Sequence, residues 1–330
     1  MMNKKIYTTL ILIFVFIGTG FCDTLKILSF NLNGNYKGHR LEVSELWADD
    51  IITIIKQSEA DIVLLQEVYI DLIKRSDTPY FKNPKPNNVL DYFVRKLSGY
   101  SGTWKYLTSA GYMLRKDMTV DGSKYISGNK TQNNAVLFNS NKLEGIDQAK
   151  MLGFDQFTGS YLFDKNSVQV IEFTDINKNS KFVVINVHLP YNNWENAERD
   201  LNTLEKLYSL FKLKTGVIIG GDFNTQRQFL TKRNFDNVDG TKSWYYDKNF
   251  GLPTTISTTD EESFKFYNDY DHFIFNNKIK EETIMQRLGI PVDDMSFYAI
   301  RIGNNNFYNS KDFFDRISDH YPIIFEFSVE

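Results

Sequence analysis

Short apolar runs, each ended by polar residues, recur along almost the whole chain and constrain its fold more than any other feature. Helical patterns at 43–57 and 193–213 lie between them, with apolar residues on one face. Strands and helices that alternate in this way, with strands near both ends, favour two packed β-sheets with helices outside. The runs typical of buried strands are 25–32, 61–68, 134–140, 168–174, 181–189, 216–223, 270–275 and 321–329.

The first residues have the composition of a secretory signal peptide. Two lysines precede a mostly apolar run at 6–17, which is short for a membrane-spanning helix. Gly20 and Cys22 place small side chains two positions apart, so we expect a signal peptide of residues 1–22 that is cleaved after Cys22. This predicts a secreted or periplasmic protein. The alternative is a lipoprotein anchored through Cys22.

The bulk composition indicates one soluble globular domain. A chain of 330 residues with 42% hydrophobic and 24% charged residues can bury a large core. Without a linker or repeat, residues 23–330 are expected to form a single catalytic domain, monomeric and without an obligate protein partner. The net charge of −3 provides no overall basic field for capturing nucleic acid, although a bound divalent metal would bring positive charge to a site.

Side chains that can bind metals or phosphate stand at the ends of the predicted strands. Because loops at one end of a rigid sheet converge, the set predicts one shared site. Each residue alone has a plainer explanation, since Asn and Asp are common in turns. Side chains two apart on a strand share a face, so His272 is expected to point away from its neighbour. The set consists of Asn31, Glu67, His188, Asp222, Asn224, Asp271, Asp319 and His320.

The residue types in this set fit hydrolysis of a phosphodiester. Hard oxygen ligands such as Glu67, Asp319 and the Asn31 amide suit Mg²⁺, with Ca²⁺ or Mn²⁺ as alternatives. With a single cysteine, a zinc–thiolate site is excluded. Imidazoles titrate near neutrality, so His188 and His320 can exchange protons at working pH.

Six segments resemble the endonuclease/exonuclease/phosphatase superfamily, and they occur in the order found in that family. The resemblance implies an α/β fold in the form of a four-layer α/β/β/α sandwich with two packed mixed β-sheets. It also implies a divalent metal cofactor and phosphoester chemistry. The matching segments are LSFNLNG (28–34), DIVLLQEV (61–68), VINVHLP (184–190), IIGGDFNT (218–225), YDHFIF (270–275) and ISDHYPI (317–323).

The same resemblance implies a role for each matched position. Asn31, Glu67 and Asp319 would hold the metal. Asp222 would orient or deprotonate the attacking water, and Asp271 would orient His320 at the scissile phosphate. The catalytic set would be His188, Asp222, Asn224, Asp271 and His320.

Within the superfamily the chain is most similar to deoxyribonuclease I-like secreted nucleases. It departs from them at Gln132, where those enzymes have a glutamate that pairs with the first histidine, so Asn134 or a carbonyl would have to orient His188. The expected activity is endonucleolytic cleavage of DNA with little sequence specificity. Candidate contacts to the DNA backbone are Lys37, Arg40, Lys74 and Arg75.

Other substrates are compatible with the same site. The main alternative is a sphingomyelinase or phospholipase C-type enzyme that acts on a membrane lipid, with an interfacial patch formed by Trp244, Tyr245, Tyr246 and Phe250. A toxin of the cytolethal distending type and a phosphoinositide phosphatase are further options. A catalytically dead binding module is disfavoured, because every motif retains its chemical residue.

Overall fold

The structure, a computed structural model, describes most of the predicted strands and helices. The described residues are 24–32, 45–68, 89–108, 133–147, 168–190, 194–238, 256–257, 265–266, 270–287, 290–291, 298–302, 306–308, 317–318, 320 and 322–329. No helix within these ranges is both long and apolar enough to cross a membrane. The predicted signal peptide lies outside the described residues.

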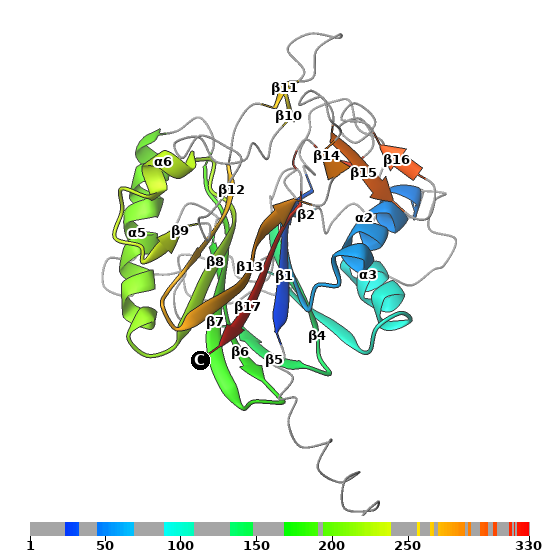
Figure 1. Ribbon diagram of the computed structural model, residues 1–330, viewed down its shortest axis with the longest axis horizontal. Helices are drawn as coiled ribbons and strands as arrows, with labels where there is room; N and C mark the ends of the chain where they lie inside the picture. The colour runs from blue at the N-terminus through cyan, green and yellow to red at the C-terminus, as the bar shows by residue number, and fades with distance from the viewer. Residues whose placement is uncertain are drawn as a thin grey trace, which may run out of the picture.

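Two six-stranded mixed sheets form the centre of the protein (Figure 1). The first sheet has the order β13-β17-β1-β2-β4-β3, in which β1 and β2 are parallel and the other neighbours are antiparallel. Its strands are β1 (Leu25–Asn31), β2 (Ile62–Val68), β3 (Trp104–Thr108), β4 (Asn133–Asn139), β13 (Ile279–Arg287) and β17 (Ile323–Val329).

The second sheet repeats this plan. Its order is β5-β6-β7-β8-β12-β9, and β7 and β8 form its one parallel pair. Its strands are β5 (Leu143–Asp147), β6 (Val168–Asp175), β7 (Ser180–His188), β8 (Gly216–Asp222), β9 (Asn237–Val238) and β12 (Asp271–Phe275). Short pairings are made by β10 (Ile256–Ser257), β11 (Lys265–Phe266), β14 (Ile290–Pro291), β15 (Tyr298–Ile302) and β16 (Asn306–Tyr308).

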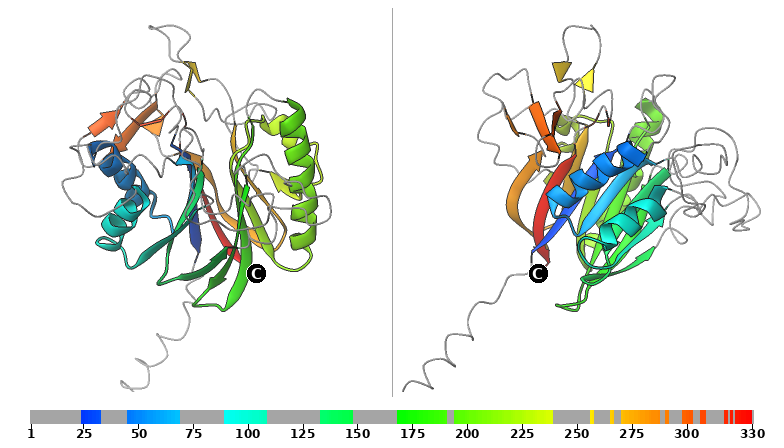
Figure 2. Two further views of the ribbon diagram at one scale, coloured as in Figure 1. Left: turned by 180° about the vertical axis from the view of Figure 1, so that it is seen from behind. Right: turned by 90° about the vertical axis from the view of Figure 1, so that its right-hand side faces the viewer.

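Helices cover the outer faces of both sheets, which confirms the predicted four-layer sandwich (Figures 1 and 2). Helices α2 (Glu45–Ser58) and α3 (Val89–Ser98) share a core with one face of the first sheet, and α5 (Trp194–Lys212) shares another with the second. A short helix, α6 (Arg227–Leu230), follows β8. The third core lies between the sheets and is rich in phenylalanine.

In the parallel pairs β1–β2 and β7–β8, the face of each strand that lies toward the other sheet is apolar at first and loses its apolar side chains near the carboxyl end. In β1, Ile27 is followed on this face by Ser29 and Asn31, because alternate residues share a face. In β7 the same change leads from Val184 to Asn186 and His188. The inter-sheet core therefore ends in a buried polar layer, which positions the candidate site.

Candidate active site

The buried carboxylate of Asp222 lies at the centre of the polar layer. Its Oδ2 accepts a hydrogen bond from Asn31 Nδ2 at 3.0 Å, and its Oδ1 accepts one from the Asn224 backbone N–H at 2.8 Å. The Nε2 atoms of His188 and His320 lie 3.6 Å and 3.7 Å from Asp222 Oδ2. One carboxylate thus contacts residues from both sheets, so these described members of the predicted set lie together.

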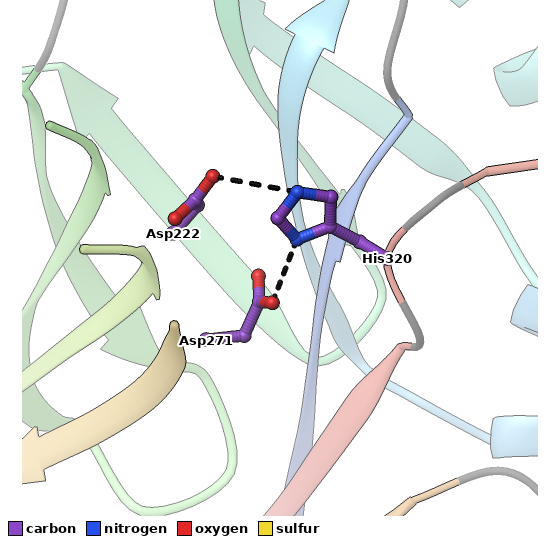
Figure 3. A group of neighbouring side chains, drawn as sticks. All are labelled: Asp222, Asp271 and His320. Atoms are coloured by element: carbon purple, nitrogen blue, oxygen red, sulfur yellow. Dashed lines mark hydrogen bonds and ion pairs between the residues drawn. The ribbon is translucent and has the colours of Figure 1, made fainter. Parts of the chain in front are cut away.

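His320 is held in one orientation by its ring and by its backbone. Its Nδ1 donates to Asp271 Oδ2 at 2.8 Å, and its Nε2 faces Asp222 (Figure 3). The backbone N–H of His320 donates to Ser318 Oγ, and the Ser318 hydroxyl donates to the Asn31 carbonyl at 2.6 Å. The structure therefore pairs Asp271 with His320, the two residues that the resemblance places together. Sequence reasoning missed Ser318, although its place in the SDHYP run was a signal.

His188 lies between two acidic side chains. Its Nε2 is 3.5 Å from Glu67 Oε1 and 3.6 Å from Asp222 Oδ2. The contact with Glu67 joins the first sheet to the second and did not follow from the sequence. Asn134, one of the two partners suggested for His188, donates to the backbone carbonyl of Asn186, two residues before His188 in β7, at 3.2 Å.

A β-bulge aims Glu67 into the site. The register of β2 against β4 shifts between Leu65 and Val68, and Glu67 has a φ of 53°. Strict alternation would turn Glu67 toward the helices, as it turns Val63 and Leu65. A bulge re-aims the side chain that it carries, and a positive φ is unfavourable for a residue with a Cβ. Asn224 also has a positive φ, 47°, so two site residues adopt this backbone conformation.

The glycines that precede Asp222 allow close approach on two sides. A Cβ on Gly220 would meet Leu64 of the opposite sheet, 2.8 Å away. Gly221 has a φ of 141°, and a Cβ there would lie 2.1 Å from the Val187 carbonyl oxygen. Only glycine fits at this position, and the close contact of β7 with β8 brings Asp222 level with His188.

Burial dominates the electrostatics of the site. It is the largest of the causes that together raise the pKa of Asp222 from 3.8 to about 6; His320 and His188 oppose the rise, and the nearby Asp271 carboxylate contributes to it. Donor atoms of Asp222, Asp271 and His320 lie within 4.8 Å of one another. Together with Glu67, three acidic side chains gather in a largely buried space. A divalent cation would offset their mutual repulsion, so the residues present fit such an ion.

The remaining predictions for the site divide into two groups. His272 points away from Asp271 as expected: its Nε2 donates to the Thr225 carbonyl at 3.1 Å, and its ring packs edge-on against Phe223. The others lie outside the described residues. These are Lys37, Arg40, Lys74, Arg75, Gln132, Asp319 and the patch formed by Trp244, Tyr245, Tyr246 and Phe250.

Comparison with known families agrees with this geometry. The model of the endonuclease/exonuclease/phosphatase family matches residues 28–320. The chain belongs to this family. Membership confirms the resemblance of the six segments at the level of the superfamily and assigns the chain to the phosphoesterases. It does not distinguish a deoxyribonuclease I-like enzyme from other members. No curated protein sequence gives a significant match.

Solved structures share the fold at low sequence identity. An endonuclease/exonuclease/phosphatase from Bacteroides vulgatus has 14% identity and a TM-score of 0.56, over 93% of this chain and 99% of that one. Danio rerio TDP2 complexed with single-strand DNA product has 11% identity and a TM-score of 0.52, over 93% and 100%. A mannosyl-6-phosphatase from Bacteroides thetaiotaomicron has 16% identity and a TM-score of 0.53, over 92% and 99%. At such identities the likeness shows the fold alone.

Proposed function

We propose that the protein is a secreted, divalent-metal-dependent phosphodiesterase that hydrolyses the DNA backbone with little sequence preference. The observation that carries the proposal is the arrangement around Asp222. Two imidazole nitrogens lie within 4 Å of one buried carboxylate, and one of the two imidazoles is itself paired with Asp271. A carboxylate and two imidazoles in contact form a set that can take up, hold and return protons near neutral pH.

The roles of the residues follow from this arrangement. Asp222 is the residue best placed to take a proton from an attacking water, because a base with a pKa of about 6 is ionised at neutral pH and still binds protons usefully. The Nδ1–H of His320 is engaged by Asp271, so its Nε2 is the atom that can bind a phosphate oxygen. His188 and Asn224 would bind the same phosphate from the second sheet.

A divalent cation fits on the side of the site formed by the first sheet. Asn31 and Glu67 are adjacent there, with 3.4 Å between Asn31 Nδ2 and Glu67 Oε1, and the sequence adds Asp319 to this set. When bound, the ion would polarise the phosphate and balance the charge that develops on it. We propose Mg²⁺ as this ion, with Mn²⁺ or Ca²⁺ as alternatives to be tested.

Two observations support DNA as the substrate. One of the structures that share the fold, that of Danio rerio TDP2, holds a single-strand DNA product. In this chain, basic residues follow closely after the two strands that carry Asn31 and Glu67. These are Lys37, Arg40, Lys74 and Arg75, which we propose contact the phosphate backbone.

The test is a plasmid-nicking assay with Mg²⁺, Mn²⁺ or Ca²⁺, run beside sphingomyelin vesicles and a sugar monophosphate. We expect nicked plasmid, and a rate that falls as salt concentration rises. If the DNA stays intact, release of choline phosphate would identify the protein as a lipid phosphodiesterase. Release of inorganic phosphate would identify it as a phosphatase. His188→Ala and His320→Ala are expected to abolish turnover. His39→Ala, which changes a histidine with no assigned role, is the matched control.

Secretion is a separate part of the proposal. N-terminal sequencing of the exported protein should begin at Asp23. Recovery in the membrane fraction with acylated Cys22 would favour the lipoprotein alternative, and full-length intracellular protein would contradict export.

A further inference from the structure

Two buried amide side chains, Gln66 and Asn186, join the sheets directly beneath the site. Both are 0% exposed. Gln66 precedes Glu67 in the first sheet, and Asn186 lies two residues before His188 in the second. Neither is in a position to touch a substrate that is bound among the site residues, so the chemistry described so far assigns no role to either.

The hydrogen bonds of Asn186 determine how both amides are oriented. Its Nδ2 donates to the carbonyl oxygens of Leu65 and Ala135, at 3.1 Å each. An amide that faces two carbonyls must present its NH₂ group to them. Its Oδ1 is then left to accept from Gln66 Nε2 at 2.7 Å, and the same Nε2 donates to Ser29 Oγ at 3.3 Å. The two amides thus form one connected link between the sheets.

This link lies at the bulge that aims Glu67. Leu65 and Ala135 are the last pair of residues in register before the bulge, and Asn186 binds the carbonyls of both. Asn186 therefore supports, from the second sheet, a backbone distortion in the first. Below the link the sheets meet through apolar side chains. Apolar packing is non-directional, so directional hydrogen bonds are needed to fix how the sheets are placed relative to each other at the site.

We infer that Gln66 and Asn186 are positioning residues, which hold the bulge and thereby set the distance between Glu67 and His188. This inference deepens the proposed function and rests on it for the roles of those two residues. The gap between His188 Nε2 and Glu67 Oε1 is 3.5 Å and spans the two sheets. Residues that support metal ligands from behind commonly change metal affinity or activity by about tenfold to a hundredfold when they are replaced.

The chain contains a matched control for the loss of such a link. Asn276 is 1% exposed, and its side chain makes three hydrogen bonds to the backbone. It donates to the Lys212 and Thr215 carbonyls and accepts from the Val217 N–H. These contacts lie at the opposite end of β8 and β12 from the site. Asn276→Leu and Asn186→Leu therefore remove the same number of side-chain hydrogen bonds at similar volume.

The experiment measures Mn²⁺ affinity by titration calorimetry, and kcat and KM for plasmid cleavage. Both are measured at a temperature at which the thermal unfolding curves show that every variant is folded. We expect Asn186→Leu to weaken Mn²⁺ binding and lower kcat, each by about tenfold or more, with little change in KM. Asn276→Leu should lower the melting temperature and leave these values unchanged. Gln66→Leu, which removes only one half of the link, is the second variant should Asn186→Leu not fold.

Equal Mn²⁺ affinity and equal kcat in the Asn186→Leu and Asn276→Leu variants would overturn the inference, because both residues would then be merely structural. The Mn²⁺ comparison does not depend on the substrate. If the wild-type protein does not cleave DNA while Asn186→Leu alone weakens Mn²⁺ binding, the proposed substrate is wrong and the positioning role stands.

Discussion

The carboxylate of Asp222 becomes buried when the chain folds. Replacing Asp222 by asparagine should therefore change how the free energy of unfolding depends on pH. Burial raises the pKa of Asp222 from 3.8 to about 6. A folded-state pKa above the unfolded value means that the folded protein binds this proton more tightly than the unfolded chain does. The resulting stabilisation is fully present below pH 3.8 and is lost as the pH rises through about 6.

The size of the effect follows from the two pKa values. The full difference corresponds to about 3 kcal/mol of unfolding free energy, of which about 2 kcal/mol is lost between pH 4.5 and pH 7.5. Asparagine does not titrate, so it escapes this loss. It keeps only one acceptor oxygen for a set of donors that includes Asn31 Nδ2 on one carboxylate oxygen and the Asn224 N–H on the other, which costs about 1–3 kcal/mol at every pH.

The quantity to measure is therefore the change with pH in the stability difference between Asp222→Asn and wild type. Urea unfolding of both proteins in EDTA, at pH 4.5 and pH 7.5, gives this change, and titrations that are independent of Asp222 cancel in the difference. We expect the variant to gain about 2 kcal/mol relative to wild type at the higher pH, and to be inactive. A stability difference that is the same at both pH values would refute the reasoning that burial dominates this carboxylate.

Three further substitutions test other parts of the site. Asp271→Asn keeps an acceptor near His320 but removes the charge, so kcat for plasmid nicking should fall by about a hundredfold or more at constant KM; unchanged kcat would contradict the pairing. Gly221→Ala places a Cβ against the Val187 carbonyl, so urea unfolding should show that the free energy of unfolding falls by about 3 kcal/mol. A variant as stable as wild type would show that β7 and β8 can move apart. Glu67→Gln should weaken Mg²⁺ binding by about tenfold in calorimetry, and unchanged affinity would remove Glu67 from the metal site.

The strands found from the sequence alone are the interior strands of the two sheets. The eight apolar runs correspond to β1, β2, β4, β6, β7, β8, β12 and β17, and each has a neighbour on both sides. The strands that were missed at the sheet edges are β3, β5, β9 and β13. Edge strands are short, or carry charged residues that prevent further pairing, as in β13 with Lys280, Glu281 and Arg287. An apolar run in the sequence therefore predicts a central strand, whereas edge strands give only a weak signal of this kind.

The sequence by itself predicted which strand-end residues gather at one site and indicated the family that the comparison then showed, because strand alternation and short motifs are local properties. It also predicted the pairing of Asp271 with His320. Only the tertiary structure placed Glu67 beside His188 and put the Gln66–Asn186 link beneath them. These contacts join segments separated by about 120 positions in the chain. They depend on how two sheets are placed against each other and on a bulge that breaks alternation, and no local pattern specifies either.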